Sequence, residues 1–307
     1  MKACIDIGGT KVAVSLASGA DLELLARRSE PTAKTGANDA LARQVIRMVD
    51  EACAETGVAA NSVQQAGVSS CGPFVLRDGL VEVAAPNICG GLAGPAAGLP
   101  NDWRTALLEA PLRTRFSQVR IENDGVAALE AERRWGALQG LDHCAYVTWS
   151  TGVGMGLCVD GRPLHGKNGN AGHGGHMFAS DNGDALCGCG NIGDVEALVG
   201  GSAIARRFGA DAATLLQRAE DGDPAAGAQV DGLCRVMGRA LYNLIAILDL
   251  QRISLGGSVF GKHQEYLLPR LQAQVAEKLP ALTAGCELVA AGLGDRVGDY
   301  AALALVV

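Results

Sequence analysis

The chain has 307 residues, 48% of them hydrophobic, which is enough for one large core or two domains. Its 42 glycines follow no three-residue period and only 4% of its residues are aromatic, so the composition excludes a collagen-like chain and favours an α/β protein with many tight turns. The formal net charge of −7, without a basic cluster, argues against binding to nucleic acid or to an anionic membrane.

The first half of the chain begins with a strand, a glycine turn and a second strand in "ACIDIGGTKVAVSLA" (3–17). Apolar residues at helical spacing predict a helix over residues 38–57, which Gly57 would end. Residues 64–74 are expected to form a buried strand that ends in a Gly-Pro turn. Residues 85–103 are rich in glycine and proline and predict a loop.

The second half repeats this plan. Residues 119–140 predict a strand followed by a helix, and "AYVTWSTGVGMGLCVDGRPL" (145–164) predicts another strand, glycine turn and strand. Residues 232–250 predict a long buried helix, and residues 252–260 a strand that enters a Gly-Gly turn before a helix broken at Pro269. Two similar hairpins half a chain apart suggest two related lobes that face each other.

The glycine turns are candidates for binding phosphate. In "DIGGTK" the glycines let backbone N–H groups approach an anion, while Thr10 and Lys11 add a hydroxyl and a positive charge. The turn at residues 150–156 offers a second set of N–H groups, and the strand that follows it excludes a dinucleotide-binding motif, which requires a helix there. Either turn alone is most simply an ordinary hairpin. Both together, with Asp6 ending the first strand and "LGGS" after a third, favour a clamp on a polyphosphate.

Asp124 stands where a predicted strand meets a predicted helix. An aspartate at this position is most often an N-cap. The functional alternative is a carboxylate in a cleft between the lobes that accepts a proton from a substrate hydroxyl and orients it for phosphoryl transfer.

Eight of the ten cysteines are scattered along the chain, mostly in apolar runs, and are expected to be small buried residues in a reducing compartment. No apolar run is long enough to cross a bilayer and no signal peptide is recognisable, so the sequence predicts a cytoplasmic protein. Only Cys187 and Cys189 form a close pair, within the stretch "NAGHGGHMFASDNGDALCGCGNIGDVEAL" (170–198). Two histidines precede this pair, and an Asp and a Glu follow it.

Taken together, the motifs resemble those of the ROK family of sugar kinases and repressors over nearly the whole chain. "DIGGTK", "STGVGMG" and "SLGGSV" resemble its two phosphate motifs and its adenosine-side turn, and "GVSSCGPF" and "APNICGG" resemble its sugar-side loops. "NDGVAALEAE" resembles the segment that carries its catalytic aspartate. "NAGHGGH" through "CGCGNIGDVEAL" resembles its Glu-x-Gly-His and Cys-x-Cys-Gly-x-x-Gly-Cys-x-Glu signature.

The resemblance implies an α/β, actin-like (hexokinase/ribonuclease H-like) two-lobed ATPase fold with a cleft between the lobes. The N-terminal small lobe is expected at residues 1–122 and the large lobe, with the metal loop, at residues 123–295. The closing helix, about residues 296–307, is expected to pack back on the small lobe.

The resemblance also implies the site and its cofactors, ATP and Mg²⁺. Asp124 would be the catalytic residue. The residues expected to bind the nucleotide and its metal are Asp6, Gly8, Gly9, Thr10, Lys11, Ser150, Thr151, Gly152, Gly154, Gly256 and Gly257. The residues expected to bind the sugar are Asn87, Asn123, Asp124, His173, His176 and Glu196. Whether the phosphoryl donor is ATP or polyphosphate is left open, and a homodimer is expected.

The family signature holds a structural zinc through a histidine and three cysteines. The corresponding residues here are His176, Cys187, Cys189 and Asp194, so an aspartate replaces the third thiolate. Zinc accepts thiolate, imidazole and carboxylate ligands, so the site is chemically allowed, although it should hold zinc more weakly than three thiolates do. The alternative is a metal-free loop with two free thiols.

His173 departs from the family, which has a sugar-reading glutamate at this position. A neutral imidazole both donates and accepts a hydrogen bond, whereas a carboxylate only accepts. The change favours a kinase that phosphorylates the 6-hydroxyl of an altered glucose, with kanosamine (3-amino-3-deoxyglucose) as the leading candidate. The alternatives are an ordinary glucokinase or an N-acetylhexosamine kinase and, from other classes, a non-catalytic sugar-binding regulator or a phosphohydrolase.

Overall fold

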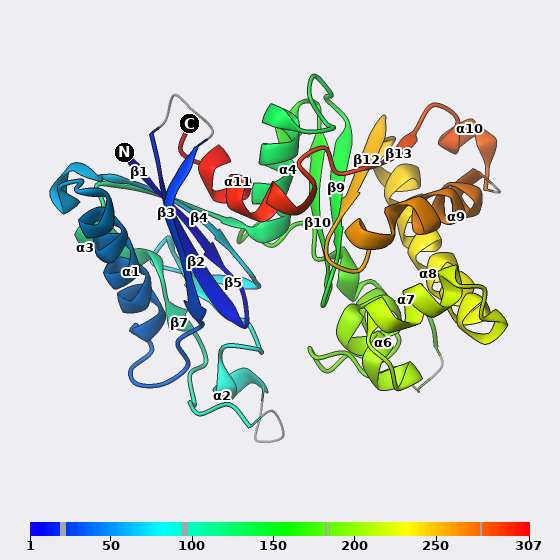
Figure 1. The fold of residues 1–307 in the computed structure, drawn as a ribbon, viewed down its shortest axis with the longest axis horizontal. Coiled ribbons are helices and arrows are strands. Elements are labelled where there is room, and N and C mark those ends of the chain that lie inside the picture. Colours follow the sequence, from blue (N-terminus) through cyan, green and yellow to red (C-terminus); the bar gives the residue numbers. More distant parts are fainter. Residues whose placement is uncertain (19–22, 94–97, 182, 184, 277) are drawn as a thin grey trace. The chain divides into compact units, whose positions relative to one another are not determined.

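The computed structural model describes residues 1–18, 23–93, 98–181, 183, 185–276 and 278–307 (Figure 1). The chain divides into two compact units. Unit 1 comprises Met1–Ala131, His165–Ala171 and Gly298–Val307, and unit 2 comprises Glu132–Leu164 and Gly172–Val297. Across the described residues, no helix combines the length and the apolar character that a membrane span requires.

Unit 1 is built on a five-stranded mixed sheet in the order β3-β2-β1-β4-β8 (Figure 1). Its strands are β1 (Lys2–Ile7), β2 (Lys11–Ala17), β3 (Leu24–Pro31), β4 (Gln65–Ser70) and β8 (Gln118–Asn123). The first three strands pair antiparallel, and β1, β4 and β8 pair parallel. The predicted strand-turn-strand at residues 3–17 and the strand at residues 64–74 are confirmed.

Helix α1 (Ala40–Thr56) packs on β2 and β3 and fills the core of unit 1. The apolar residues that predicted it are fully buried: Leu41, Val45, Met48, Val49 and Ala52. The helix ends where predicted, because Gly57 adopts a left-handed backbone conformation with φ of 70° that favours glycine.

The remaining elements of unit 1 include a three-stranded antiparallel sheet in the order β5-β6-β7. They are η1 (Ala60–Ser62), β5 (Phe74–Arg77), β6 (Leu80–Val83), α2 (Gly90–Ala93), β7 (Ala106–Leu107), α3 (Glu109–Arg115) and α11 (Val297–Ala304). Helix α4 (Asp124–Trp135) begins in unit 1 and ends in unit 2.

The prediction that residues 85–103 form only loop is wrong, because α2 lies within them. The Asn101 side chain holds this helix in place: its Oδ1 accepts from Gly90 N at 2.8 Å, and its Nδ2 donates to Ile88 O at 3.0 Å. A Cβ on Gly90 would lie 2.0 Å from Asn101 O, so the glycines that suggested a loop also permit this close packing. Residues 94–97 of the predicted loop lie outside the described residues.

Unit 2 repeats the sheet plan of unit 1, with the order β11-β10-β9-β12-β13. Its strands are β9 (Cys144–Trp149), β10 (Val153–Val159), β11 (Arg162–Pro163), β12 (Arg252–Gly256) and β13 (Glu287–Ala290). The hairpin of β9 and β10 is antiparallel, as is β10 with β11, and β9, β12 and β13 are parallel. The second predicted strand-turn-strand is therefore confirmed, and it begins the same arrangement of strands as the first.

Helices surround the unit 2 sheet: η3 (Gly174–His176), α5 (Val195–Val199), α6 (Gly201–Phe208), α7 (Ala212–Glu220), α8 (Pro224–Leu248), η4 (Gly261–His263), α9 (Gln264–Ala276), α10 (Pro280–Thr283) and η5 (Gly294–Arg296). The long buried helix is confirmed as α8, and it begins eight residues earlier than predicted because Asp223 caps it. The predicted break at Pro269 is wrong, since α9 runs through it. Pro269 lies in the second turn, where its missing N–H costs one hydrogen bond near the helix start.

Glu132, near the end of α4, is a fully buried carboxylate that no pattern in the sequence singles out. Its oxygens accept hydrogen bonds from Ser254 Oγ at 3.1 Å, Ala137 N at 2.8 Å, Gly292 N at 3.0 Å and Leu293 N at 2.9 Å. A buried charge is tolerated only when its hydrogen bonds are satisfied, so Glu132 fastens α4 to β12 and to the segment after β13.

Candidate functional site

In unit 1, the turn between β1 and β2 lies against a sugar-side loop. A Cβ on Gly9 would stand 2.0 Å from Nδ2 of Asn87, so any larger residue would require the Asn87 amide to shift. Gly8 N donates to Lys11 O at 2.9 Å and closes the turn, and the Thr10 and Lys11 side chains are exposed. The structure thus brings the predicted phosphate turn and the predicted sugar ligand Asn87 into contact.

Asp6 and Asp124 come from neighbouring parts of the same sheet. Asp6 lies near the end of β1, Asp124 directly follows β8, and β4 lies between these two parallel strands. The carboxyl ends of parallel strands share one edge of a sheet, which is where α/β proteins bind ligands. Burial and, next, the charge of Asp124 raise the pKa of Asp6 to about 6, although Ser69 Oγ, which donates to Asp6 Oδ1 at 3.3 Å, lowers it.

Asp124 is the first residue of α4 rather than the residue before it. Its Oδ1 accepts from Gly125 N at 2.8 Å, and Oδ1 of the buried Asn123 accepts from the same N–H at 3.0 Å. The start of the helix therefore has two acceptors for one donor. Capping alone does not require the carboxylate of Asp124.

Cys71, which the sequence assigned to the general set of buried thiols, lies beside these two carboxylates. Its N–H donates to Ile7 O at 2.8 Å, just beyond β4. Burial raises the pKa of its thiol, and the charges of Asp124 and Asp6 raise it further, so the sulfur is a neutral thiol. Six of the eight scattered cysteines are buried as expected, and Cys71 and Cys286 are half-buried.

In unit 2, the turn after β9 together with the first two residues of β10 (residues 150–154, called the second turn) is held from one side by Glu196. Glu196 Oε2 accepts from Val153 N at 2.9 Å, and a Cβ on Gly152 would lie 2.3 Å from the same oxygen. Ser150 N donates to Gly152 O at 2.9 Å and closes the turn. Gly154 lies within β10, opposite Thr148 of β9.

The turn after β12 lies beside the second turn. The hydroxyl oxygens of Ser150 and Ser258 are 2.9 Å apart. Gly257 has a φ of 96°, and a Cβ there would lie 2.4 Å from Trp149 O, so this close approach requires glycine. The structure thus assembles Ser150, Gly256 and Gly257 in one part of unit 2.

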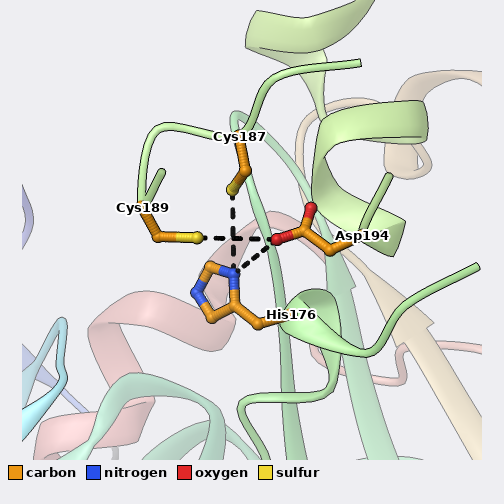
Figure 2. A group of neighbouring side chains, drawn as sticks. All are labelled: His176, Cys187, Cys189 and Asp194. Atoms are coloured by element: carbon orange, nitrogen blue, oxygen red, sulfur yellow. Dashed lines mark hydrogen bonds and ion pairs between the residues drawn. The ribbon is translucent and has the colours of Figure 1, made fainter. Parts of the chain in front are cut away.

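The four predicted metal ligands form one group, the metal group: His176, Cys187, Cys189 and Asp194, whose ligand atoms all lie within 4.8 Å of one another. Figure 2 shows the four side chains pointing toward a common point. Asp194 Oδ2 is 3.2 Å from His176 Nδ1 and 3.5 Å from Cys189 Sγ, and Cys187 Sγ is 3.7 Å from His176 Nδ1.

Three of these separations, 3.2, 3.5 and 3.7 Å, are close to those around a tetrahedral ion, and the others are within 4.8 Å. Zinc bound at about 2.0–2.3 Å from nitrogen, oxygen and sulfur places its ligand atoms about 3.3–3.8 Å apart. Burial raises the pKa of the Cys187 thiol, so a metal ion would have to displace its proton on binding. The residues present therefore fit zinc in both donor type and spacing.

Asp194 has a second role that its place in the cysteine pattern concealed. The residue is fully buried, and its Oδ1 accepts from Ala197 N at 2.7 Å as the N-cap of α5. The other carboxylate oxygen faces the metal group. One side chain thus both caps a helix and offers a ligand, which a thiol would do less well because cysteine is a poor N-cap.

His173 immediately precedes η3, and its ring centroid is 6.1 Å from that of His176. The glycines around it pack tightly on β10: a Cβ on Gly172 would lie 2.1 Å from Met155 O, and one on Gly175 would lie 2.2 Å from Val153 O. The repeated glycines of "GHGGH" therefore seat this loop on the strand that follows the second turn.

The predicted site residues fall into two sets. Unit 1 holds Asp6, Gly8, Gly9, Thr10, Lys11, Asn87, Asn123 and Asp124, and unit 2 holds Ser150, Thr151, Gly152, Gly154, His173, His176, Cys187, Cys189, Asp194, Glu196, Gly256 and Gly257. The sequence missed Cys71 and Asn101. A cysteine at the end of a buried strand that leads to a Gly-Pro turn was the available signal for the first.

Comparison with known proteins gives consistent results. A model of the ROK family matches residues 2–307. An N-acetylmannosamine kinase of Shigella boydii is 35% identical over 274 residues, which cover 86% of this chain and 84% of that protein. The crystal structure of a ROK hexokinase from Thermus thermophilus superposes with a TM-score of 0.77 at 30% identity, covering 99% of this chain and 97% of the other.

A ROK glucokinase from Streptomyces griseus, solved in complex with glucose and AMPPNP, superposes with a TM-score of 0.69 at 26% identity, covering 98% of this chain and 97% of the other. With the two similar sheets, these matches confirm the predicted two-lobed, actin-like α/β fold.

Proposed function

Since the chain belongs to the ROK family and is a sugar kinase, we propose that it transfers the γ-phosphoryl group of ATP to the 6-hydroxyl of N-acetylmannosamine. The observation that carries this substrate is His173, which stands where the family resemblance expects a sugar-reading glutamate, in a chain 35% identical to an N-acetylmannosamine kinase. The relatives above are named for hexose, glucose and N-acetylmannosamine. They support the alternatives that the sequence left open, an ordinary glucokinase or an N-acetylhexosamine kinase, rather than kanosamine.

On the acceptor side, Asp124 would accept the proton of the 6-hydroxyl and orient its oxygen, and Asn87 and Asn123 would bind other hydroxyls. Little covalent chemistry is required of the protein in phosphoryl transfer, so positioning dominates. Asn123 Oδ1 accepts from Gly125 N at 3.0 Å, the same N–H that Asp124 Oδ1 contacts. Asn123 would therefore help to position Asp124 at the start of α4.

On the donor side, backbone N–H groups of the first turn (residues 8–10) and of the second turn would hold the phosphates, with Thr10 and Lys11 adding a hydroxyl and a charge. Gly256 and Gly257 would leave room for the adenosine. Mg²⁺, when bound, would neutralise the developing charge on the phosphates. Asp6 is the residue suited to hold the ion through its waters, because a cation there would offset the repulsion between Asp6 and Asp124 that raises the pKa of Asp6.

The metal group would hold a structural zinc, which fits the four donors and their spacing. It would fix His176 and the start of α5, which carries Glu196, and the family resemblance assigns both residues to sugar binding. It would take no part in the transfer itself.

The test is a coupled ADP-release assay that compares kcat/KM for N-acetylmannosamine, glucose, mannose and kanosamine. N-acetylmannosamine should be preferred, and His173→Glu should shift the ratio toward glucose by about tenfold or more while the KM for ATP stays nearly constant, because a polar pocket rejects analogues that leave its groups unpaired. His143→Glu, at the opposite end of β9 from the second turn, is the control and should leave the ranking unchanged. A wild-type protein that prefers glucose, with a ranking that His173→Glu does not alter, would contradict the assignment.

A further inference from the structure

Helix α5 connects the metal group to the second turn. At its start, the metal-group residue Asp194 caps the helix by accepting from Ala197 N at 2.7 Å. At its end, three hydrogen bonds join it and the residues that follow it to the segment 149–151. They are Trp149 Nε1 to Val199 O at 2.7 Å, Gly201 N to Ser150 O at 2.8 Å and Ser202 N to Thr151 O at 3.1 Å.

The Glu196 side chain makes a second connection between the same two places. Its Oε2 accepts from Val153 N at 2.9 Å in the second turn, and its Oε1 is 3.6 Å from Cys187 Sγ in the metal group. Gly152 lets the turn lie directly against this carboxylate, since a Cβ on Gly152 would stand 2.3 Å from Oε2 and the Glu196 side chain would have to shift. The position of the second turn therefore depends on the position of the Glu196 carboxylate.

We propose that α5 and Glu196 couple occupancy of the metal group to the geometry of the second turn, so that Glu196 is a positioning residue for nucleotide binding. This rests on the proposed role of the second turn in holding phosphates. Sugar binding, which the family resemblance assigns to Glu196, would use other lone pairs of the same carboxylate, because an ionised carboxylate accepts about four hydrogen bonds.

The first test measures amide hydrogen exchange at Val153 without sugar or nucleotide, in protein of known zinc content. Removing zinc with a chelator should raise exchange at Val153 by about fivefold or more, because the hydrogen bond to Glu196 opens when its support is lost. Glu196→Ala should raise it similarly with zinc retained, Glu196→Gln should raise it less, and chelation of the Ala variant should add little. Arg206→Gln is the matched control. Arg206 donates to the carbonyl oxygen of Leu186, the residue before Cys187, at 3.1 Å and makes no such bond to the second turn.

The second test separates positioning from general support of the fold. In Glu196→Gln the KM for ATP should rise by about tenfold, with kcat changing less, and Arg206→Gln should leave both unchanged. Exchange at Val153 that does not respond to zinc removal would overturn the proposal, as would a rise confined to the KM for sugar. Failure of the wild type to phosphorylate any hexose would instead contradict the proposed function. The exchange experiment would still test the coupling, because it is made without sugar or nucleotide.

Discussion

The two carboxylate oxygens of Asp194 have different partners, so the helix cap and the metal ligand can be tested separately. Oδ1 caps α5 through Ala197 N at 2.7 Å, and Oδ2 lies 3.2 Å from His176 Nδ1 and 3.5 Å from Cys189 Sγ in the metal group. Asp194→Cys would restore a third thiolate and remove the cap. Asp194→Asn would keep a capping oxygen and remove the charge, since Asn and Asp cap helices about equally well.

The two variants should therefore behave in opposite ways. Without metal, Asp194→Cys should lower the free energy of unfolding by about 1 kcal/mol, the usual loss for an N-cap, and Asp194→Asn should change it much less. With zinc, Asp194→Cys should retain the ion against a chelator better than the wild type does, because thiolate is the softer ligand, and Asp194→Asn should retain it worse.

Urea unfolding of chelated protein and zinc release to a competing chelator provide the two measurements. The wild type purified without chelator should contain close to one zinc per chain. A wild type without zinc, or an Asp194→Cys variant that binds zinc no more tightly, would refute the metal assignment. Equal loss of metal-free stability in both variants would refute the assignment of Oδ1 as the cap.

Asp124→Asn should lower sugar turnover by about 10²–10⁴-fold with nucleotide affinity unchanged, as expected for a lost proton acceptor, and near wild-type turnover would remove Asp124 from the mechanism. The pKa of Asp6 is about 6 against 3.8 in the unfolded chain, so the folded protein binds the extra proton between these values and loses stability as the pH rises through that window. Asp6→Asn should consequently raise the denaturant midpoint of unfolding at pH 8 and leave it unchanged at pH 4. Equal shifts at the two pH values would contradict the explanation that ionisation of Asp6 lowers the stability. Glu132→Gln should lower the free energy of unfolding by about 3 kcal/mol, because an amide nitrogen cannot accept the N–H and O–H donors around it. Glu130→Gln, on the same helix but partly exposed, is its control in denaturant unfolding and should have little effect.

The sequence predicted the features that depend on residues close together in the chain. Hairpins, their glycine turns and the α1 helix follow from local periodicity and turn chemistry. Three metal-group members, His176, Cys187 and Cys189, lie close together in the sequence, so the family signature could be matched to them, and the resemblance implied a shared ion. Local pattern misled at Pro269, where the helix continues because the proline lies close enough to its start.

Contacts between distant residues could not be predicted in this way. Glu132 and Asn101 are ordinary polar residues in the sequence, and only the packed structure shows their hydrogen bonds to segments far away in the chain. The proximity of Asp6 and Asp124 follows from strand order, since β1 and β8 are separated by β4 alone. No spacing in the sequence encodes that order.

The two units also share a contact between a glycine of the hairpin turn and a polar side chain, which the sequence pattern of the hairpins did not predict. In unit 1 the amide of Asn87 occupies the space where a Cβ of Gly9 would be, and in unit 2 the carboxylate of Glu196 occupies the space beside Gly152. Each hairpin turn is thus in contact with a polar side chain from a distant segment, and the family resemblance assigns both side chains to the sugar. Glycine in these turns therefore does more than allow N–H groups to approach an anion, because it also lets a side chain proposed to bind the sugar lie against a turn proposed to bind phosphate. We therefore expect Gly9→Ala to displace the Asn87 amide and Gly152→Ala to displace the Glu196 carboxylate, so that either change would disturb the proposed phosphate and sugar ligands together.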